Sequence, residues 1–512
     1  MKKIISTILL LSFGFQITNA QSLTLIKDIH TNGSSNPHRL TTFSNKICFV
    51  ANNGNGNKLY ASDGTSAGTN LIGPSVGTGN LYPIVSYNNS LFFTYDDGIS
   101  GAELWKSDGT SSGTTLVKDI SAGSGSSQPR NLTGANSLVF FTTNSPNNGI
   151  WSSDGTNAGT KLLINNTIVE AFNNQESFAS FNNEVYFSGN NGDLGLWKSD
   201  GSVAGTQLLK NIRVNSYSKG YVEMNNLMYF TASDNTSYAE LWKTDGTTTG
   251  TTLVKDINLT GESTPTNYLK KGNQFYFLAD DGIHGQELWI SDGSNSGTKM
   301  VKDITTGSQT SNIQSITEYN SEVYFFVYKN AQRDLYKSDG TEAGTVFLKT
   351  IPYNSIPYSY VFNGKLYFSA RSNNATYLYQ SDGTPSGTQI ISPNILAEDY
   401  AGYNFITYQS NLYLPAYSGQ IGVELHKFIP SDLSTKDSSS EKISVFPNPA
   451  HEIFNILTRE NVKSVNAFDV SGKKVVVKKI SENQYQISEK GFYFLEIELK
   501  NGQKSLSKIM MK

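Results

Sequence analysis

Cysteine is almost absent from this chain of 512 residues. Cys48 is the only one, so the chain cannot close an internal disulfide, and we expect its thiol to lie buried in a strand. Charged residues are sparse too, at 16%, and the net charge of -3 gives no basic surface of the kind that binds nucleic acid. After the first 20 residues, no segment approaches the roughly 18 apolar residues of a transmembrane helix.

Glycine and aromatic residues are plentiful by contrast. The chain has 45 glycines beside 14 prolines, and Phe, Tyr and Trp make up 12% of it. Short aromatic runs alternate with stretches rich in Asn, Ser, Thr and Gly, which is typical of short strands joined by tight turns. We therefore predict an all-β protein, and its length favours several domains or a repeat array over one globule.

The N-terminus has the layout of a secretory signal peptide. Lys2 and Lys3 precede an apolar run from Ile4 to Phe15, and small residues lead to Ala20. We predict a signal peptide over 1–20 and export of the remainder; a buried N-terminal helix is the alternative. No cysteine follows position 20, so a lipoprotein anchor is not indicated.

One phrase returns along most of the chain. It reads Glu-Leu-Trp-Lys-Ser-Asp-Gly-Thr at 103–110, followed by two variable residues and Gly-Thr. The aromatic of this phrase recurs at Tyr60, Trp105, Trp151, Trp197, Trp242, Trp289, Tyr336 and Tyr379, with His426 in the same place. The mean step is about 46 residues, close to one four-stranded blade of a β-propeller.

Each repeat can be divided into four strands. The first two are joined by a turn that carries Asn, which tolerates positive φ, and the aromatic second strand should be buried on both faces. The Glu-Leu-Trp strand is third, and Ser-Asp-Gly-Thr-x-x-Gly-Thr leads into the fourth. We interpret its aspartate as a turn former rather than a catalytic or metal-binding group, because copies placed once per repeat diverge. These aspartates are Asp63, Asp108, Asp154, Asp200, Asp245, Asp292, Asp339 and Asp382.

The two ends of the array complement each other. Residues 25–29 form a fourth strand with no repeat before it, whereas the ninth repeat stops at 428 without a fourth strand. Pairing the two would close a ring and remove both exposed edges. We predict that residues 21–428 form nine four-stranded units of a closed β-propeller; an open solenoid is the alternative. Over about residues 23–428, the repeat resembles the family named for its Glu-Leu-Trp-x-x-Asp-Gly-Thr (ELWxxDGT) signature in secreted bacterial proteins, a resemblance that implies no particular activity.

Composition changes after residue 428. Residues 429–442 read as a polar linker, and alternating apolar residues over 443–512 predict a small immunoglobulin-like β-sandwich. This last stretch has 11 Lys and Arg against 7 Asp and Glu.

Four motifs in this stretch resemble the type A C-terminal sorting domain of type IX secretion in Bacteroidota. They are Val-Phe-Pro-Asn-Pro at 445–449, Phe-Asp-Val-Ser-Gly-Lys-Lys-Val at 468–475, Lys-Gly-Phe-Tyr-Phe-Leu at 490–495 and Lys-Ile-Met-Met-Lys at 508–512. The resemblance marks Asn448, Pro449, Asp469, Gly472 and Gly491 as sorting-motif residues. It implies recognition by the secretion machinery through 443–512, cleavage of the domain, and cargo that is released or attached to the cell surface. A sandwich that serves adhesion is the alternative.

Catalytic and cofactor-binding patterns are not found. The five histidines have neither zinc spacing nor a triad-like acidic neighbour. Two acidic loops, with Asp96 and Asp97 and with Asp280 and Asp281, are weak metal candidates, since Ca²⁺ takes 6 to 8 oxygen ligands and plain acidic turns explain them better. We predict a surface or released binding protein whose ligand is a glycan or a protein. An extracellular enzyme acting on polysaccharide and a structural coat component are the alternatives.

Overall fold

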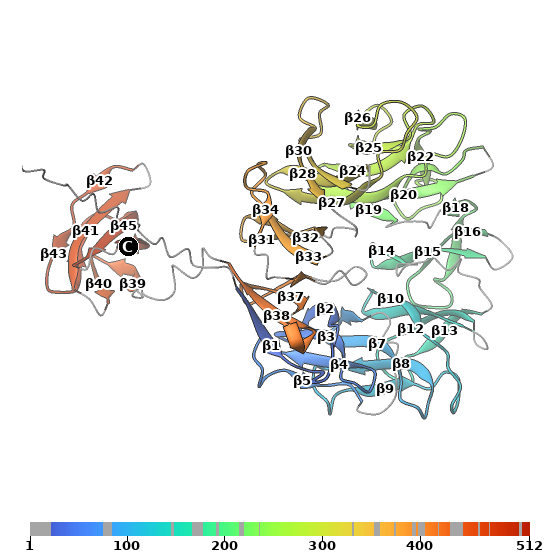
Figure 1. The fold of residues 1–512 in the computed structure, drawn as a ribbon, viewed down its shortest axis with the longest axis horizontal. Coiled ribbons are helices and arrows are strands. Elements are labelled where there is room, and N and C mark those ends of the chain that lie inside the picture. The colour runs from blue at the N-terminus through green and yellow to red at the C-terminus, as the bar shows by residue number, and fades with distance from the viewer. Residues whose placement is uncertain are drawn as a thin grey trace, which may run out of the picture. The chain divides into compact units, whose positions relative to one another are not determined.

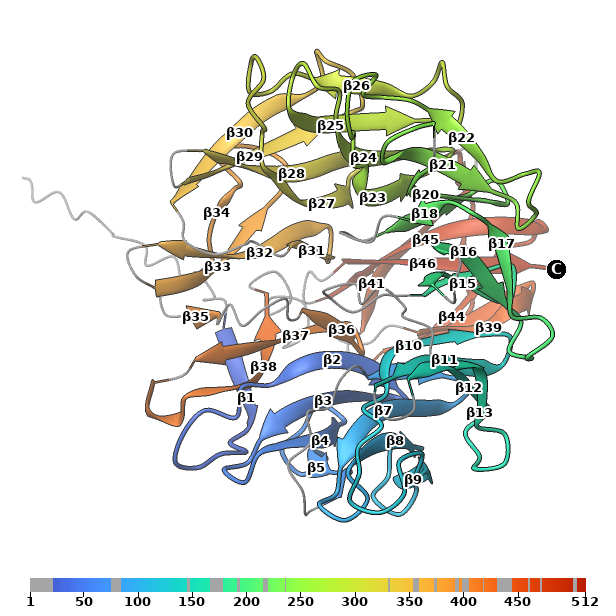
Figure 2. The ribbon, with the colours of Figure 1, turned by 90° about the vertical axis from the view of Figure 1, so that its right-hand side faces the viewer.

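The computed structural model contains strands almost throughout and divides into two compact units, a repeat region (Gln21–Phe428) and a C-terminal region (Ile429–Lys512), shown in Figures 1 and 2. The structure describes residues 22–74, 84–144, 148–165, 178–190, 194–214, 220–234, 236–329, 332–352, 359–372, 375–391, 396–397, 405–417, 419–430, 444–458, 461–469, 472–500 and 504–512. The predicted signal peptide and most of the predicted linker lie outside these residues. In the described part of the chain, no helix is long and apolar enough to cross a membrane.

The repeat region is a succession of antiparallel sheets. After β1 (Ser22–Lys27), the first four units are β2 (His38–Phe43), β3 (Lys46–Asn52), β4 (Asn57–Ser62), β5 (Asn70–Leu71); β6 (Val85–Tyr87), β7 (Ser90–Asp96), β8 (Ala102–Ser107), β9 (Thr115–Lys118); β10 (Arg130–Ala135), β11 (Leu138–Thr143), β12 (Gly149–Ser153), β13 (Lys161–Asn165); and β14 (Ala179–Phe181), β15 (Glu184–Asn190), β16 (Leu194–Ser199), β17 (Gln207–Lys210). The next three are β18 (Arg213–Val214), β19 (Tyr221–Met224), β20 (Leu227–Ser233), β21 (Glu240–Thr244), β22 (Thr252–Lys255); β23 (Thr266–Lys271), β24 (Gln274–Asp280), β25 (Gln286–Ser291), β26 (Lys299–Lys302); and β27 (Ile313–Tyr319), β28 (Glu322–Lys329), β29 (Gln332–Ser338), β30 (Val346–Pro352).

The last two units share one 9-stranded sheet, which also contains β1. Its other strands are β31 (Ser359–Phe362), β32 (Lys365–Ser372), β33 (Ala375–Ser381), β34 (Gln389–Ile390), β35 (Leu396–Ala397), β36 (Ile406–Tyr408), β37 (Asn411–Tyr417) and β38 (Val423–Ile429), with the short 3-10 helix η1 (Gly419–Ile421) before β38. The all-β expectation is therefore confirmed for the described residues.

The second strand of each unit is buried on both faces, as its composition predicts. In the sixth unit, five consecutive residues of β24, from Phe275 to Ala279, are buried. Phe277 lies opposite Trp289 of β25, and their ring centroids are 6.3 Å apart. The repeated aromatic is thus a core residue that joins the second and third strands.

The turn between the first two strands takes the predicted positive φ at Asn45, Asn89, Asn136, Asn183, Asn226, Asn320 and Asn363. Two units differ from the expectation. In the sixth unit, Gly272 has the positive φ and Asn273 does not. In the ninth unit, Gln409 and Ser410 have the positive φ and Asn411 begins β37. The turn lies earlier in the chain than the position of this asparagine suggests.

Recurring contacts join several pairs of neighbouring units in the repeat region. The lysine of a fourth strand donates to a threonine carbonyl of the following unit, as Lys118 Nζ does to Thr160 O at 3.2 Å and Lys302 Nζ to Thr345 O at 2.9 Å. In several units, the turn glycine also lies against the second-strand tyrosine of the unit before it. A side chain at Gly293, for example, would overlap Tyr229 Oη.

The first and last strands of the repeat region, β1 and β38, are neighbours in one sheet, and the lysine and glycine contacts recur there. Strand β1 is hydrogen-bonded to β38, which lies about 400 residues later in the chain. Lys27 of β1 donates to Thr69 O of the first unit at 2.7 Å, and a side chain at Gly64 would overlap Tyr413 Oη of the ninth. The first unit therefore contacts the ninth through interactions that also join several interior units, with β1 as the fourth strand of the ninth unit (Figure 1).

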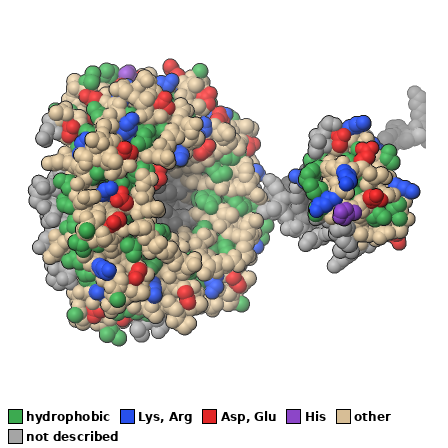
Figure 3. All heavy atoms as spheres, turned by 180° about the vertical axis from the view of Figure 1, so that it is seen from behind, with side chains coloured by type: hydrophobic (Ala, Val, Ile, Leu, Met, Phe, Trp, Pro, Cys, Tyr) green, Lys and Arg blue, Asp and Glu red, His purple; other side chains and the backbone are tan. Residues whose placement is uncertain are grey.

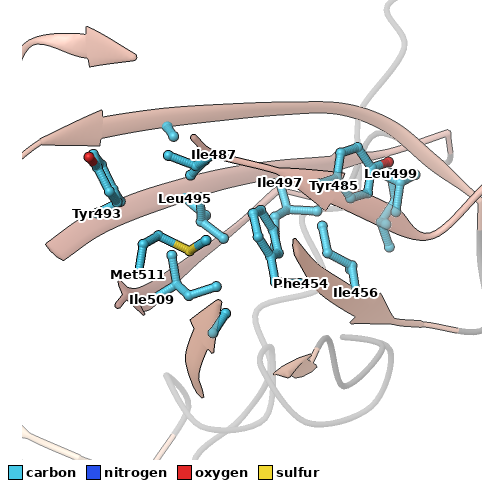
Figure 4. Packing of buried hydrophobic residues seen from close by; sticks show 13 residues of the cluster. Phe454, Ile456, Tyr485, Ile487, Tyr493, Leu495, Ile497, Leu499, Ile509 and Met511 are labelled. Atoms are coloured by element: carbon cyan, nitrogen blue, oxygen red, sulfur yellow. The ribbon is translucent and has the colours of Figure 1, made fainter. Parts of the chain in front are cut away.

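The C-terminal region contains one 8-stranded assembly in two parts that are joined by the long strand β39. Its strands are β39 (Ser444–His451), β40 (Ile453–Leu457), β41 (Val462–Asp469), β42 (Lys474–Val475), β43 (Lys478–Lys479), β44 (Gln484–Gln486), β45 (Gly491–Leu499) and β46 (Lys504–Met511). Phe454, Tyr485, Leu495, Ile497 and Ile509 belong to a core of its own, shown in Figure 4.

Candidate functional site

The repeated aspartate of the third turn accepts hydrogen bonds from its own turn. In the fifth unit, Asp245 Oδ1 accepts from Thr247 N at 2.8 Å and from Thr247 Oγ1 at 2.7 Å. Gly250 N donates to Thr247 Oγ1, and Thr251 Oγ1 donates to Thr247 O. The phrase recurs with the same spacing because its Asp, Thr and second Gly-Thr are linked by one set of hydrogen bonds.

The same network occurs in all eight predicted turns, each in its own unit, so the structure does not bring these carboxylates together. Hydrogen bonds from the following Thr or Ser lower the pKa of each aspartate below its usual value. The accepting residues are Asp63, Asp108, Asp154, Asp200, Asp245, Asp292, Asp339 and Asp382. A purely structural role for them stays a prediction.

The second glycine of the phrase has a structural role that turn preferences do not predict. A Cβ at Gly250 would overlap the Asp245 carboxylate, and the same overlap recurs in the other seven turns. The glycine is needed because the carboxylate folds back over the end of the turn. Residue preferences for turns do not predict this requirement for glycine, because it depends on where the aspartate carboxylate lies in the folded turn.

A double-mutant cycle tests this coupling. We expect Asp245→Ala and Gly250→Ala each to lower the free energy of unfolding by about 1 to 3 kcal/mol, through lost hydrogen bonds and through overlap respectively. The double variant should lose less than the sum, because no carboxylate then remains for the added methyl group to meet. Gly261→Ala is the control, since its Cβ would come no nearer than 3.5 Å to Asn258 Nδ2. Additive losses measured by denaturant unfolding would contradict the coupling.

The glutamate of Glu-Leu-Trp was also missed as a structural residue. Glu103, Glu240, Glu287 and Glu424 are fully buried. Glu103 accepts hydrogen bonds from Ser127 N at 2.8 Å and Ile120 N at 3.1 Å, so it ties the third strand to the connection that leads into the next unit. In the ninth unit, Glu424 accepts from Ser35 N at 2.9 Å and thereby holds the two ends of the repeat region together.

Stability should fall with rising pH through one of these glutamates. Burial raises the pKa of Glu287 to about 7, and nearby Asp303 adds to the shift. Between the ordinary glutamate value and about 7, the unfolded chain loses this proton while the folded chain keeps it, so the free energy of unfolding decreases across that window. In Glu287→Gln, the drop in melting temperature from pH 5 to pH 8 should be smaller than in the parent and in the exposed-site control Glu262→Gln. An unchanged drop would contradict this assignment.

The carboxylates of the two acidic loops accept hydrogen bonds from backbone N–H groups of their own loops. Asp96 Oδ1 accepts from Gly98 N at 2.8 Å, and Asp97 Oδ1 accepts from Ile99 N at 2.8 Å. Asp280 and Asp281 accept from Gly282 N and Ile283 N in the same manner, and Asp281 Oδ2 lies 2.7 Å from His284 Nδ1. Among the described residues, no group of three or more His, Cys, Asp or Glu side chains could hold a metal ion.

Three large apolar side chains are exposed to solvent on loops of the fifth and sixth units. Tyr238 is 57% exposed, Leu259 81% and Ile283 66%; we call these three residues the apolar loop cluster. Tyr238 and Ile283 lie between the second and third strands of their units, and Leu259 follows a fourth strand. Because second and fourth strands run in the same direction, all these loops leave the sheets at one end, opposite the aspartate turns.

The backbone around the cluster is held in place. Thr264 N donates to Ala239 O at 2.9 Å, and Asp280 N donates to Ser263 O at 2.9 Å. A Cβ at Gly282 would lie 2.7 Å from Asn258 Oδ1, so the loops that carry Leu259 and Ile283 are in contact. On the face seen in Figure 3, acidic, basic and hydrophobic side chains are interspersed, and no single charge dominates.

The predicted sorting residues lie at a register shift, in a turn and at the start of a strand of the C-terminal region. Asn448 and Pro449 lie in β39, where the register with β40 shifts and the strand passes to β46. Asp469 Oδ1 accepts from Lys473 N at 3.0 Å, and Gly472 has a φ of 83° in the same turn. Gly491 begins β45.

Comparison with known proteins identifies this region. A family model described as the secretion system C-terminal sorting domain matches residues 444–512. The chain therefore carries a type IX sorting domain, which indicates export to the cell surface or the extracellular space and interaction with the secretion machinery. The predicted type A assignment stays a prediction. A comparison with curated proteins finds no significant match.

Solved structures give only distant likenesses to the chain. One is from work on two prolyl endopeptidases, with 8% identity and a TM-score of 0.41 over 93% of this chain and 56% of that one. Another is PorZ, a surface component of the type IX secretion system of Porphyromonas gingivalis, with 12% identity and a TM-score of 0.31 over 92% and 75%. A puromycin hydrolase has 11% identity and a TM-score of 0.33 over 69% and 60%. The chain thus spans little more than half of the first structure. TM-scores this low do not assign a function to the chain.

Proposed function

We propose that residues 21–428 form a closed nine-bladed β-propeller of the ELWxxDGT repeat family, which works as a binding module after type IX export. Its ligand is an extracellular protein or glycan, and the apolar loop cluster is the contact surface. The observation that carries the proposal is the exposure of Tyr238, Leu259 and Ile283 on loops fixed by backbone hydrogen bonds. Rigid exposed apolar groups contribute affinity because little conformational entropy is lost when they bind.

The shared contacts support the closed ring. Glu424, Lys27 and Gly64 join the first and last units with the interactions found between interior units. Ring closure pairs β38 with β1 and leaves only the short edge strands of the individual units, which suits a protein exposed outside the cell. In this proposal the turn aspartates build the end opposite the binding surface.

The test is a binding screen of the mature secreted protein against extracellular glycans and surface proteins, with a polysaccharide hydrolase panel alongside. We expect the double variant Leu259→Ser with Ile283→Ser to bind the ligand identified by the screen about tenfold or more weakly, without a change in melting temperature. Val203→Ser is the matched control, since Val203 is 64% exposed on a turn at the opposite end. Equal binding by the parent and the cluster variant, or turnover of a polysaccharide, would contradict the proposal.

A further inference from the structure

One face of the sorting domain presents aromatic side chains to solvent. Phe492 is 58% exposed and Phe494 is 42% exposed, although both lie in β45, between β41 and β46. Their neighbours along the strand, Tyr493 and Leu495, point to the opposite face and are buried in the core. The exposed pair is therefore not needed to fill the interior of the domain.

Cross-strand neighbours extend this surface. Phe492 pairs with Met510 of β46, and Phe494 pairs with Lys508 on one side and with Phe468 of β41 on the other. Residues directly opposite each other in antiparallel strands lie on the same face. Lys508 Nζ lies 5.8 Å from the centroid of the Phe494 ring. We call these five residues the aromatic sheet face.

We propose that the aromatic sheet face is the surface by which this domain docks onto a protein of the outer-membrane secretion machinery. The inference rests on the sorting role of residues 444–512. A contiguous apolar patch on a soluble domain marks an interaction site, and aromatic residues are enriched in the buried centre of protein interfaces.

The net positive charge of the sorting domain indicates which kind of surface the partner presents. Residues 443–512 contain 11 Lys and Arg against 7 Asp and Glu, and Lys508 lies within the face. A second copy of this domain would bring one net positive charge against another, which disfavours self-association, although Glu496 follows Phe494 on the same side of β45. The docking site on the partner is therefore an apolar surface with a carboxylate placed to meet Lys508.

The experiment follows the full chain in a bacterium with a working type IX system. Phe492→Thr with Phe494→Thr keeps strand-forming residues on the surface, and we expect secretion to fall by about tenfold or more while folded protein collects in the periplasm. Val476→Thr, at a site 86% exposed in the same domain, should be secreted normally. A chain without 444–512 separates the two claims: if the deletion traps the protein and the double variant is still exported, docking by this face is wrong; if the deletion itself is exported, the sorting role is wrong.

A cross-linking measurement covers the case in which the double variant fails to fold. A benzophenone amino acid at position 492 retains an aromatic group, and one at position 476 is the control. We expect a light-dependent adduct with an outer-membrane protein from position 492 and none from position 476. Adducts only with the repeat region or with a second copy would overturn the proposal.

Discussion

A chain that lacks residues 21–30 should aggregate and lose cooperative unfolding. The deletion removes β1, which leaves β38 as an unpaired edge and exposes the core that Ile26 shares with Tyr413 and Leu425. Unpaired edges of this kind invite association with other chains. We expect size-exclusion chromatography to show large species, and calorimetry to show a broad transition at a lower temperature.

An open array predicts a different outcome for the same deletion. In a solenoid each repeat contacts only its neighbours, so one end would fray and the rest would unfold as before. Lys27→Met is the control, because it removes the hydrogen bond to Thr69 O and leaves β1 in place. A monomeric deletion variant with a sharp transition would contradict the ring.

Removing residues 444–512 should abolish secretion and leave a folded repeat region in the periplasm. The family match assigns sorting to this stretch, and the two regions form separate compact units. Fractionation with immunoblotting gives the location, and resistance to limited proteolysis shows whether the retained protein is folded. Normal levels of the truncated protein in the medium would contradict the assignment.

Local features were predictable from the sequence. The turn at Asp245 and the buried strand at Phe275 depend on residues close together in the chain, where turn and strand preferences apply directly. The motifs around Asp469 and Gly472 also predicted the sorting domain that the family match finds.

Long-range partners were not predictable in the same way. The role of Gly250 depends on where the Asp245 carboxylate folds back, and the role of Glu287 depends on a connection that returns to it in space. One signal was available for the glutamates, since a serine follows Glu103 and Glu287 after 24 residues and Glu240 after 23. The exposed pair Phe492 and Phe494 looked like ordinary strand residues, because alternation alone does not say which face of a sandwich is covered.

The most direct test of the closed ring is a disulfide between its two ends. Ile26→Cys and Leu425→Cys, with the neighbouring registers, are introduced in a Cys48→Ser background, since Ile26 and Leu425 lie in the same core cluster. The account predicts that one register forms an intramolecular disulfide in the folded monomer, and that small-angle scattering of the repeat region shows a compact particle. Failure of every register to cross-link, together with scattering from an elongated particle, would contradict it.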